Sequence, residues 1–164
     1  MFDRIRQEAI LESWVALIGS ANGRSEEFFR RAAEVLASNK VPSIVLDYKE
    51  VAPSFEKGLF GKKRPAIIVT NKKLLEYKMF IMCRDYGNQL SISWYLVSGS
   101  PLLYTLSKIG TKQNPFDVFQ LEELSCWVST AHHTVIDVTK EIAESVNFDF
   151  SKVEQKSRGF LNVS

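Results

Sequence analysis

The sequence predicts an α+β domain with a largely antiparallel sheet of four or five strands, two N-terminal helices and a long C-terminal helix packed on one face. Three observations lead to this prediction: alternating apolar residues on either side of a turn at Gly87, apolar residues at helical spacing after Pro115, and prolines at segment boundaries. We expect a single domain over residues 1–147, followed by a tail over 148–164 that docks on the domain or is flexible.

The N-terminal segments are assigned from the spacing of their apolar residues. Residues 2–18 carry them at steps of three and four, which predicts an amphipathic helix, and a second helix is expected over about 25–39. Alternation over 43–51, between Pro42 and Pro53, then predicts a strand.

The segment 66–97 predicts a hairpin with one fully apolar face, called the first face here. A two-residue loop at Tyr86 and Gly87 would place Asp85 opposite Asn88. In this register the first face is formed by four pairs: Cys83 with Leu90, Ile81 with Ile92, Met79 with Trp94, and Tyr77 with Leu96. The opposite face, called the second face, is mixed but still largely apolar, so it also needs cover.

The C-terminal helix is expected from just after Pro115 to about Asn147. Its apolar residues recur at steps of three and four, at Leu121, Leu124, Val128, Ala131, Val135, Val138, Ile142 and Val146. A coiled coil would use the same stripe, but a helix that covers a sheet face is favoured.

Composition and charge narrow the class of protein. The chain has 164 residues, of which 45% are hydrophobic and 24% charged, and this excludes wholesale disorder. The N-terminus does not read as a secretory signal and no segment reads as a membrane span, so a cytoplasmic protein without membrane insertion is expected. Cys83 and Cys126 are expected to be buried free thiols, and neither a metal nor a cofactor is expected.

The favoured function is a non-catalytic binding or interaction module that uses the second face and the 99–115 connection. Its expected contact residues are Phe80, Met82, Tyr95, Val97, Leu102 and Tyr104. Because these residues are more apolar than a solvated surface, we expect a protein partner or self-association, with an apolar small molecule as a further candidate.

A nucleic-acid-associated protein is the first alternative. This alternative uses the basic region from Lys57 to Lys73 around the start of the hairpin, with Lys62, Lys63, Arg64, Lys72 and Lys73 as its contact residues and aromatic residues nearby. The net charge of +2 is too small to indicate a polyanionic partner, and a solvated loop is favoured over this alternative.

A nucleotide-dependent enzyme is the second alternative. The loop from Gly19 to Ser25, followed by a helix and then a strand with Asp47, fits a phosphate-binding unit if residues 14–18 form a strand. The helical spacing that begins at Phe2 favours a helix-to-helix turn instead.

Three polar residues on the expected C-terminal helix could form a catalytic triad or simply an ordinary polar surface. Ser129, His133 and Asp137 recur every four residues, the order of a nucleophile, a base and an orienting acid. A solvated helix surface offers no pocket, so a polar face is favoured, and the adjacent His132 points away from His133 and does not complete a metal site.

Overall fold

The computed structural model describes residues 4–5, 9–53, 62–99 and 117–164. Its elements, in chain order, are β1 (Arg4–Ile5), β2 (Ile10–Gly19), α1 (Ser25–Ser38), β3 (Ile44–Pro53), β4 (Arg64–Asn71), β5 (Tyr77–Tyr86), β6 (Gln89–Ser98), α3 (Val118–Ser145), the 3-10 turn η3 (Phe150–Lys152) and β7 (Arg158–Gly159).

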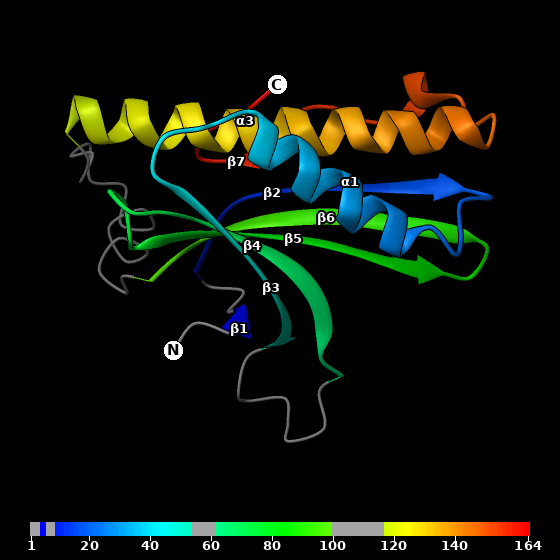
Figure 1. Ribbon diagram of the computed structural model, residues 1–164. Helices are drawn as coiled ribbons and strands as arrows, with labels where there is room; N and C mark the ends of the chain where they lie inside the picture. Colours follow the sequence, from blue (N-terminus) through cyan, green and yellow to red (C-terminus); the bar gives the residue numbers. More distant parts are fainter. Residues whose placement is uncertain (1–3, 6–8, 54–61, 100–116) are drawn as a thin grey trace.

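The strands that the structure describes form a single sheet in the order β1-β3-β4-β5-β6-β2-β7. Six of them are antiparallel, and the two-residue edge strand β1 pairs in parallel with β3. Helices α1 and α3 lie together on one side of this sheet (Figure 1). The fold is therefore α+β, with one helix layer over the first face.

The predicted helix over residues 2–18 is wrong, and with it the prediction of two N-terminal helices and a sheet of four or five strands. Residues Ile10–Gly19 form β2, which pairs with β6 along nearly its whole length. Trp14 is buried, whereas Val15 and Leu17 are 60% and 47% exposed. Because both faces of β2 carry apolar residues, the alternation of a strand is hidden in the sequence and resembles helical spacing.

The β5–β6 hairpin has the predicted faces but a different register. Tyr86 is opposite Gln89, so the turn residues are Gly87 and Asn88, and every predicted pair is displaced by two residues. Gly87 has φ +63°, which a two-residue hairpin turn requires at its first position. A shift of two residues preserves the side-chain alternation, and for this reason the first face was assigned correctly.

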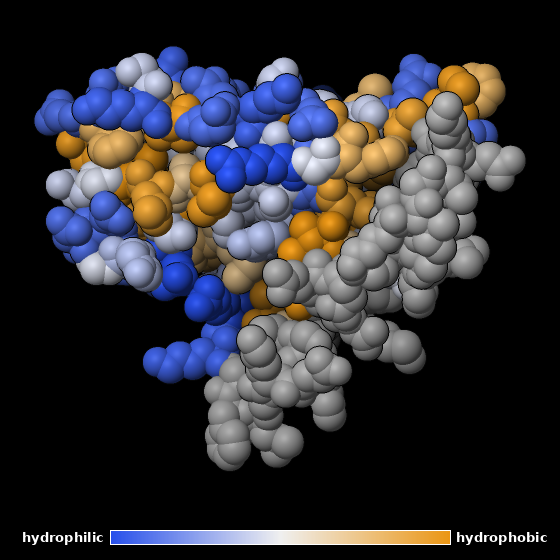
Figure 2. Space-filling model, turned by 180° about the vertical axis from the view of Figure 1, so that it is seen from behind, coloured by the Kyte–Doolittle hydropathy of each residue, from blue (hydrophilic) through white to orange (hydrophobic). Residues whose placement is uncertain are grey.

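The long C-terminal helix is present as α3. Asp117 caps its first turn: the Asp117 carboxylate accepts a hydrogen bond from the Gln120 amide at 2.9 Å, and the Gln120 side chain accepts one from the Asp117 amide at 3.3 Å. The predicted stripe faces the first face of the sheet. Viewed from behind, the top of the molecule, where α3 lies, is mainly hydrophilic, with hydrophobic residues below it (Figure 2).

The two cysteines differ in their burial. Cys83 is buried in the first-face core, as predicted, and burial raises the pKa of its thiol. Cys126 is exposed on α3, so the prediction of a buried thiol is wrong there. Cys126 directly precedes the buried Trp127 but points to a different side of the helix, because consecutive helical residues diverge by about 100°.

Candidate functional site

The second face of the sheet carries its own small core, separate from the one beneath the helices. Its buried members are Val51, Ala66, Ile68, Phe80 and Val97, and the partly buried residues around them are Ile5, Ala9, Ile10, Met82 and Tyr95. Of the predicted contact residues, Phe80 and Val97 are only 1% and 3% exposed, so they are buried members of this core. Met82 and Tyr95 are half-buried, and Leu102 and Tyr104 lie outside the described residues.

Two adjoining hollows lie over this core. The larger, of about 480 Å³, is lined by Ile5, Ile10, Val51, Ala52, Lys62, Arg64, Met82 and Tyr95. The smaller, of about 220 Å³, is lined by Val15, Arg64, Met82, Cys83, Arg84, Ser91, Ser93 and Tyr95. Arg64, Met82 and Tyr95 line both, so we treat the two hollows as one site and call it the groove.

Neighbouring strands bring two arginines to the same hollow of the groove. Ala66 of β4 is opposite Met82 of β5. The β4–β5 pairing ends there, and Arg64 and Arg84 lie two positions beyond this pair on the same face, where both line the smaller hollow. The Arg84 guanidinium lies 5.1 Å from the centre of the Tyr86 ring. No carboxylate among the described residues forms an ion pair with Arg64 or Arg84.

The predicted basic cluster is divided by the fold. Lys62, Lys63 and Arg64 lie at the start of β4, whereas Lys72 and Lys73 follow its end. Eight residues of strand span about 26 Å, so the two groups face different partners. Lys73 points toward Glu123 of α3, with Nζ 3.8 Å from the carboxylate. Of these five residues, the structure brings only Lys62 and Arg64 to the groove.

The Gly19–Ser25 loop does join a strand to a helix, as the nucleotide alternative requires. The loop's Gly23 amide, however, donates to the Asp85 carboxylate at 2.8 Å, so one of the loop amides already binds an anionic group of the chain itself. Asp47 lies on β3, four strand spacings or about 19 Å from β2, and pairs with Lys49 at 2.7 Å. The structure does not bring Asp47 to this loop.

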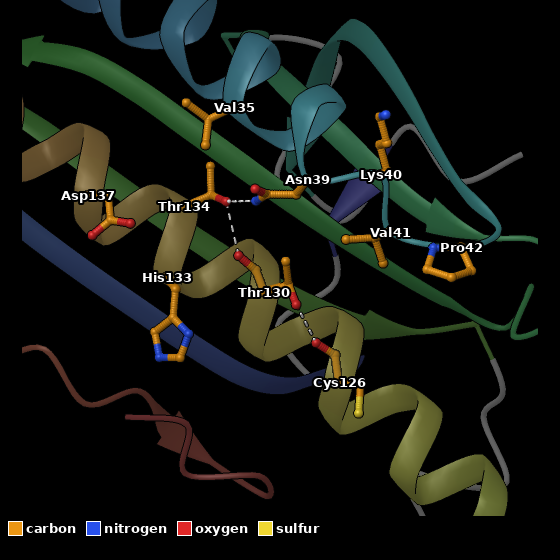
Figure 3. Close-up of a pocket in the computed structure, with 10 residues that line it drawn as sticks. All are labelled: Val35, Asn39, Lys40, Val41, Pro42, Cys126, Thr130, His133, Thr134 and Asp137. Carbon is orange, nitrogen blue, oxygen red and sulfur yellow. Dashed lines mark hydrogen bonds between the residues drawn. The ribbon is translucent and has the colours of Figure 1, made fainter.

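The line of Ser129, His133 and Asp137 on α3 does not form a catalytic arrangement. His133 Nε2 is 2.9 Å from the backbone oxygen of Ser164, and no hydrogen bond joins it to Ser129 or Asp137 in the described part of the chain. A pocket of about 470 Å³ between α1 and α3 is lined by both His133 and Asp137. Figure 3 shows His133 turned away from the Asn39–Thr134 hydrogen bond of 3.0 Å that joins the two helices.

His132 is a structural histidine of the first-face core. It is fully buried, its Nδ1 accepts a hydrogen bond from Trp94 Nε1 at 3.0 Å, and its Nε2 donates to the Gln155 carbonyl at 2.7 Å. This pattern requires the neutral ring with the proton on Nε2. Burial lowers the pKa of His132, and the Gln155 carbonyl and the Glu12 carboxylate only partly oppose that effect.

We expect the free energy of unfolding to fall as the pH is lowered from 7 to 5. The folded state holds His132 neutral, whereas in the unfolded state the ring binds a proton below about pH 6.5. The stabilisation by neutral His132 is thus fully present above pH 6.5. It is lost as the pH falls from 6.5 toward the lowered pKa of the folded state, and the free energy of unfolding then decreases by at most about 1.4 kcal/mol per pH unit. Denaturant melts at several pH values should show a flatter profile for His132→Gln. An unchanged slope in that variant, or a flattened slope in the exposed control His133→Gln, would contradict the assignment.

Sequence reasoning missed several groove residues that the structure identifies. Arg84, Ser91 and Ser93 alternate with core residues and so belong to the second face, and this signal was available in the sequence. Val51 and Ile10 line the larger hollow only because their strands lie close to it in the sheet, and the sequence around each residue does not indicate this arrangement.

Other features of the described residues add no further site. No group of three or more His, Cys, Asp or Glu residues there could hold a metal ion. None of the helices in the described ranges is long and apolar enough to cross a membrane. Comparison with protein-family models, curated proteins and solved structures finds no match to this chain.

Proposed function

We propose that this chain is a non-catalytic binding module that takes an apolar ligand into the groove on the second face. The observation that carries the proposal is the larger hollow, about 480 Å³ in volume, in which half-buried Met82 and Tyr95 stand beside a floor of buried apolar side chains. Ligand sites of proteins typically have volumes of 300–1,000 Å³ and mostly apolar linings.

The shape of the groove favours a small ligand over a protein partner. A stable protein interface buries about 800 Å² on each partner and needs a broad complementary surface. Here the most apolar residues lie at the bottom of a hollow, while the neighbouring strand β3 carries the exposed ion pair of Asp47 and Lys49. A ligand that enters the hollow avoids these charges, whereas a flat partner would have to bury them.

A titration with a neutral fluorescent dye such as Nile red tests the proposal without involving charge. We expect saturable binding to one site by the native protein. The double variant Met82→Gln, Tyr95→Gln should bind about tenfold more weakly, because polar amides replace apolar walls that both residues provide to the groove. Val45→Gln is the matched control, since Val45 is an exposed apolar residue that lines neither hollow.

Denaturant melts of all variants establish that a change in binding is not a loss of folding. Absence of saturable binding by the native protein would contradict the proposal, as would an unchanged affinity in the double variant. A protein that binds no dye but forms concentration-dependent dimers sensitive to Met82→Gln would identify the face as a protein interface instead.

The two alternative functions receive less support from the geometry. A nucleic-acid surface needs many cations along one path, but the five predicted basic residues lie at opposite ends of β4. A nucleotide site needs free amides at the start of α1, but Asp85 binds the Gly23 amide, and Glu26 and Glu27 follow in the first turn.

A further inference from the structure

Arg64 and Arg84 form an unneutralised pair of cations within the groove. Like charges close together on one face of a sheet repel each other. In the described part of the chain neither arginine has such a carboxylate, and only the Tyr86 ring lies close to Arg84. The pair thus presents two sets of guanidinium donors to the hollow that both arginines line.

Two serine hydroxyls extend this donor set. Ser91 is opposite Arg84 on β6, Ser93 is opposite Met82, and both line the smaller hollow. No hydrogen bond to either hydroxyl occurs within the described residues, so both are available to a ligand. Paired guanidinium groups with adjacent hydroxyls are the donors that recognise carboxylate and phosphate oxygens.

The polar and apolar parts of the groove are continuous. Arg64 lines both hollows, and the half-buried Met82 and Tyr95 form the wall between the donors and the larger apolar hollow. Lys62 adds a further positive charge at the larger hollow. A ligand that satisfies both parts has an apolar body beside Met82 and Tyr95 and an oxyanion near the two arginines.

We infer that the groove selects an amphiphile with a carboxylate or phosphate head group, which Arg64 and Arg84 bind while its apolar chain occupies the larger hollow. This inference rests on the proposed binding function and specifies the ligand class of the same site. The positive charge of the groove supports this inference, because a neutral apolar ligand would leave the two guanidinium groups that line the smaller hollow without a counter-charge.

Three ten-carbon ligands that differ only in the head group test the inference: decanoate, decyl phosphate and decanol, each below its aggregation threshold and competing with the neutral dye. At neutral pH and low salt, the native protein should bind at least one of the two anions about tenfold more tightly than decanol. Raising the salt concentration should reduce this preference, because the arginines are partly exposed to solvent.

Arg64→Gln combined with Arg84→Gln should abolish the preference, so that neither anion binds more tightly than decanol. The control, Arg30→Gln combined with Lys72→Gln, removes the same net charge at exposed positions that line neither hollow, and it should retain the preference. Preference for decanoate or for decyl phosphate identifies the head group, and either result supports the inference.

The possible failures are distinguishable. Equal binding of all three ligands by the native protein, or an anion preference that survives removal of both arginines, would overturn the inference and leave the apolar binding function intact. If neither the dye nor any ten-carbon ligand binds, the proposed function and the inference are both wrong.

Discussion

Replacement of Trp94 by alanine is expected to lower the free energy of unfolding by about 3 to 5 kcal/mol. Trp94 is fully buried at the centre of the first-face core, and its ring packs edge-on against His132 with 5.5 Å between ring centres. The substitution removes this packing and also leaves the Nδ1 atom of His132 without its donor. Denaturant melts with an unchanged slope between native and variant protein would measure the loss.

Two further variants separate the contributions at this site. Trp94→Phe keeps most of the ring volume but not the indole donor, so its cost should be smaller than that of alanine, at about 1 to 3 kcal/mol. His133→Ala, on the exposed side of helix α3, should change stability by no more than about 0.5 kcal/mol. A severe loss at His133 with little change at Trp94 would show that the faces of α3 are assigned incorrectly.

Glu12→Ala is expected to cost about 2 to 4 kcal/mol and to release the C-terminal segment from the edge of the sheet. Glu12 is fully buried although it is acidic, and its carboxylate accepts hydrogen bonds from the Ser157 hydroxyl and from the Leu161 amide, the latter at 2.6 Å. The same hydroxyl accepts from the Val163 amide at 2.7 Å. The Glu12 carboxylate therefore holds the C-terminal segment from Ser157 to Val163 against β2, directly at Ser157 and Leu161 and through the Ser157 hydroxyl at Val163.

Hydrogen exchange provides the most direct measurement of this effect. The amides of Leu161 and Val163 should lose protection in Glu12→Ala, while Glu50→Ala, at an exposed position on β3, should leave them unchanged. Gly159→Ala should resemble Glu12→Ala, because a Cβ at Gly159 would collide with the Leu11 carbonyl oxygen and the Glu12 carboxylate. Persistent protection at Leu161 in Glu12→Ala would contradict the proposed anchor.

The second face is more apolar than a solvated surface because its apolar residues form the buried floor of the groove, and only the residues around that floor are at least partly exposed. Its floor residues, such as Phe80 and Val97, contribute to stability, whereas Met82, Tyr95 and Arg64 remain accessible to a ligand. Polar substitution at Phe80 would therefore unfold the protein and cannot test binding. Substitutions at the rim test it instead.

The spacing of apolar residues was sufficient to predict those helices and strands that bury a single face. The stripe of α3 follows a spacing of 3.6 residues, and the Asp117 cap marks its start, so the helix could be predicted without knowledge of its neighbours. The two faces of the β5–β6 hairpin follow from side-chain alternation, which survives a register error of two residues. For the same reason, Met82 and Tyr95 could be assigned to the second face from the sequence alone.

Tertiary structure decided everything that depends on which strands become neighbours. The apolar spacing of β2 also fits a helix. The segment is a strand because it pairs with β6, and because helices α1 and α3 cover the first face of the sheet that it joins. Arg64 and Arg84 are separated by 20 positions in the sequence and line the same hollow only because β4 and β5 are neighbouring strands. Glu12 likewise looks like an ordinary surface residue until Ser157 returns to it from the other end of the chain. Such contacts carry no local signal, because the free energy that selects them comes from burial and pairing between segments that are distant in sequence.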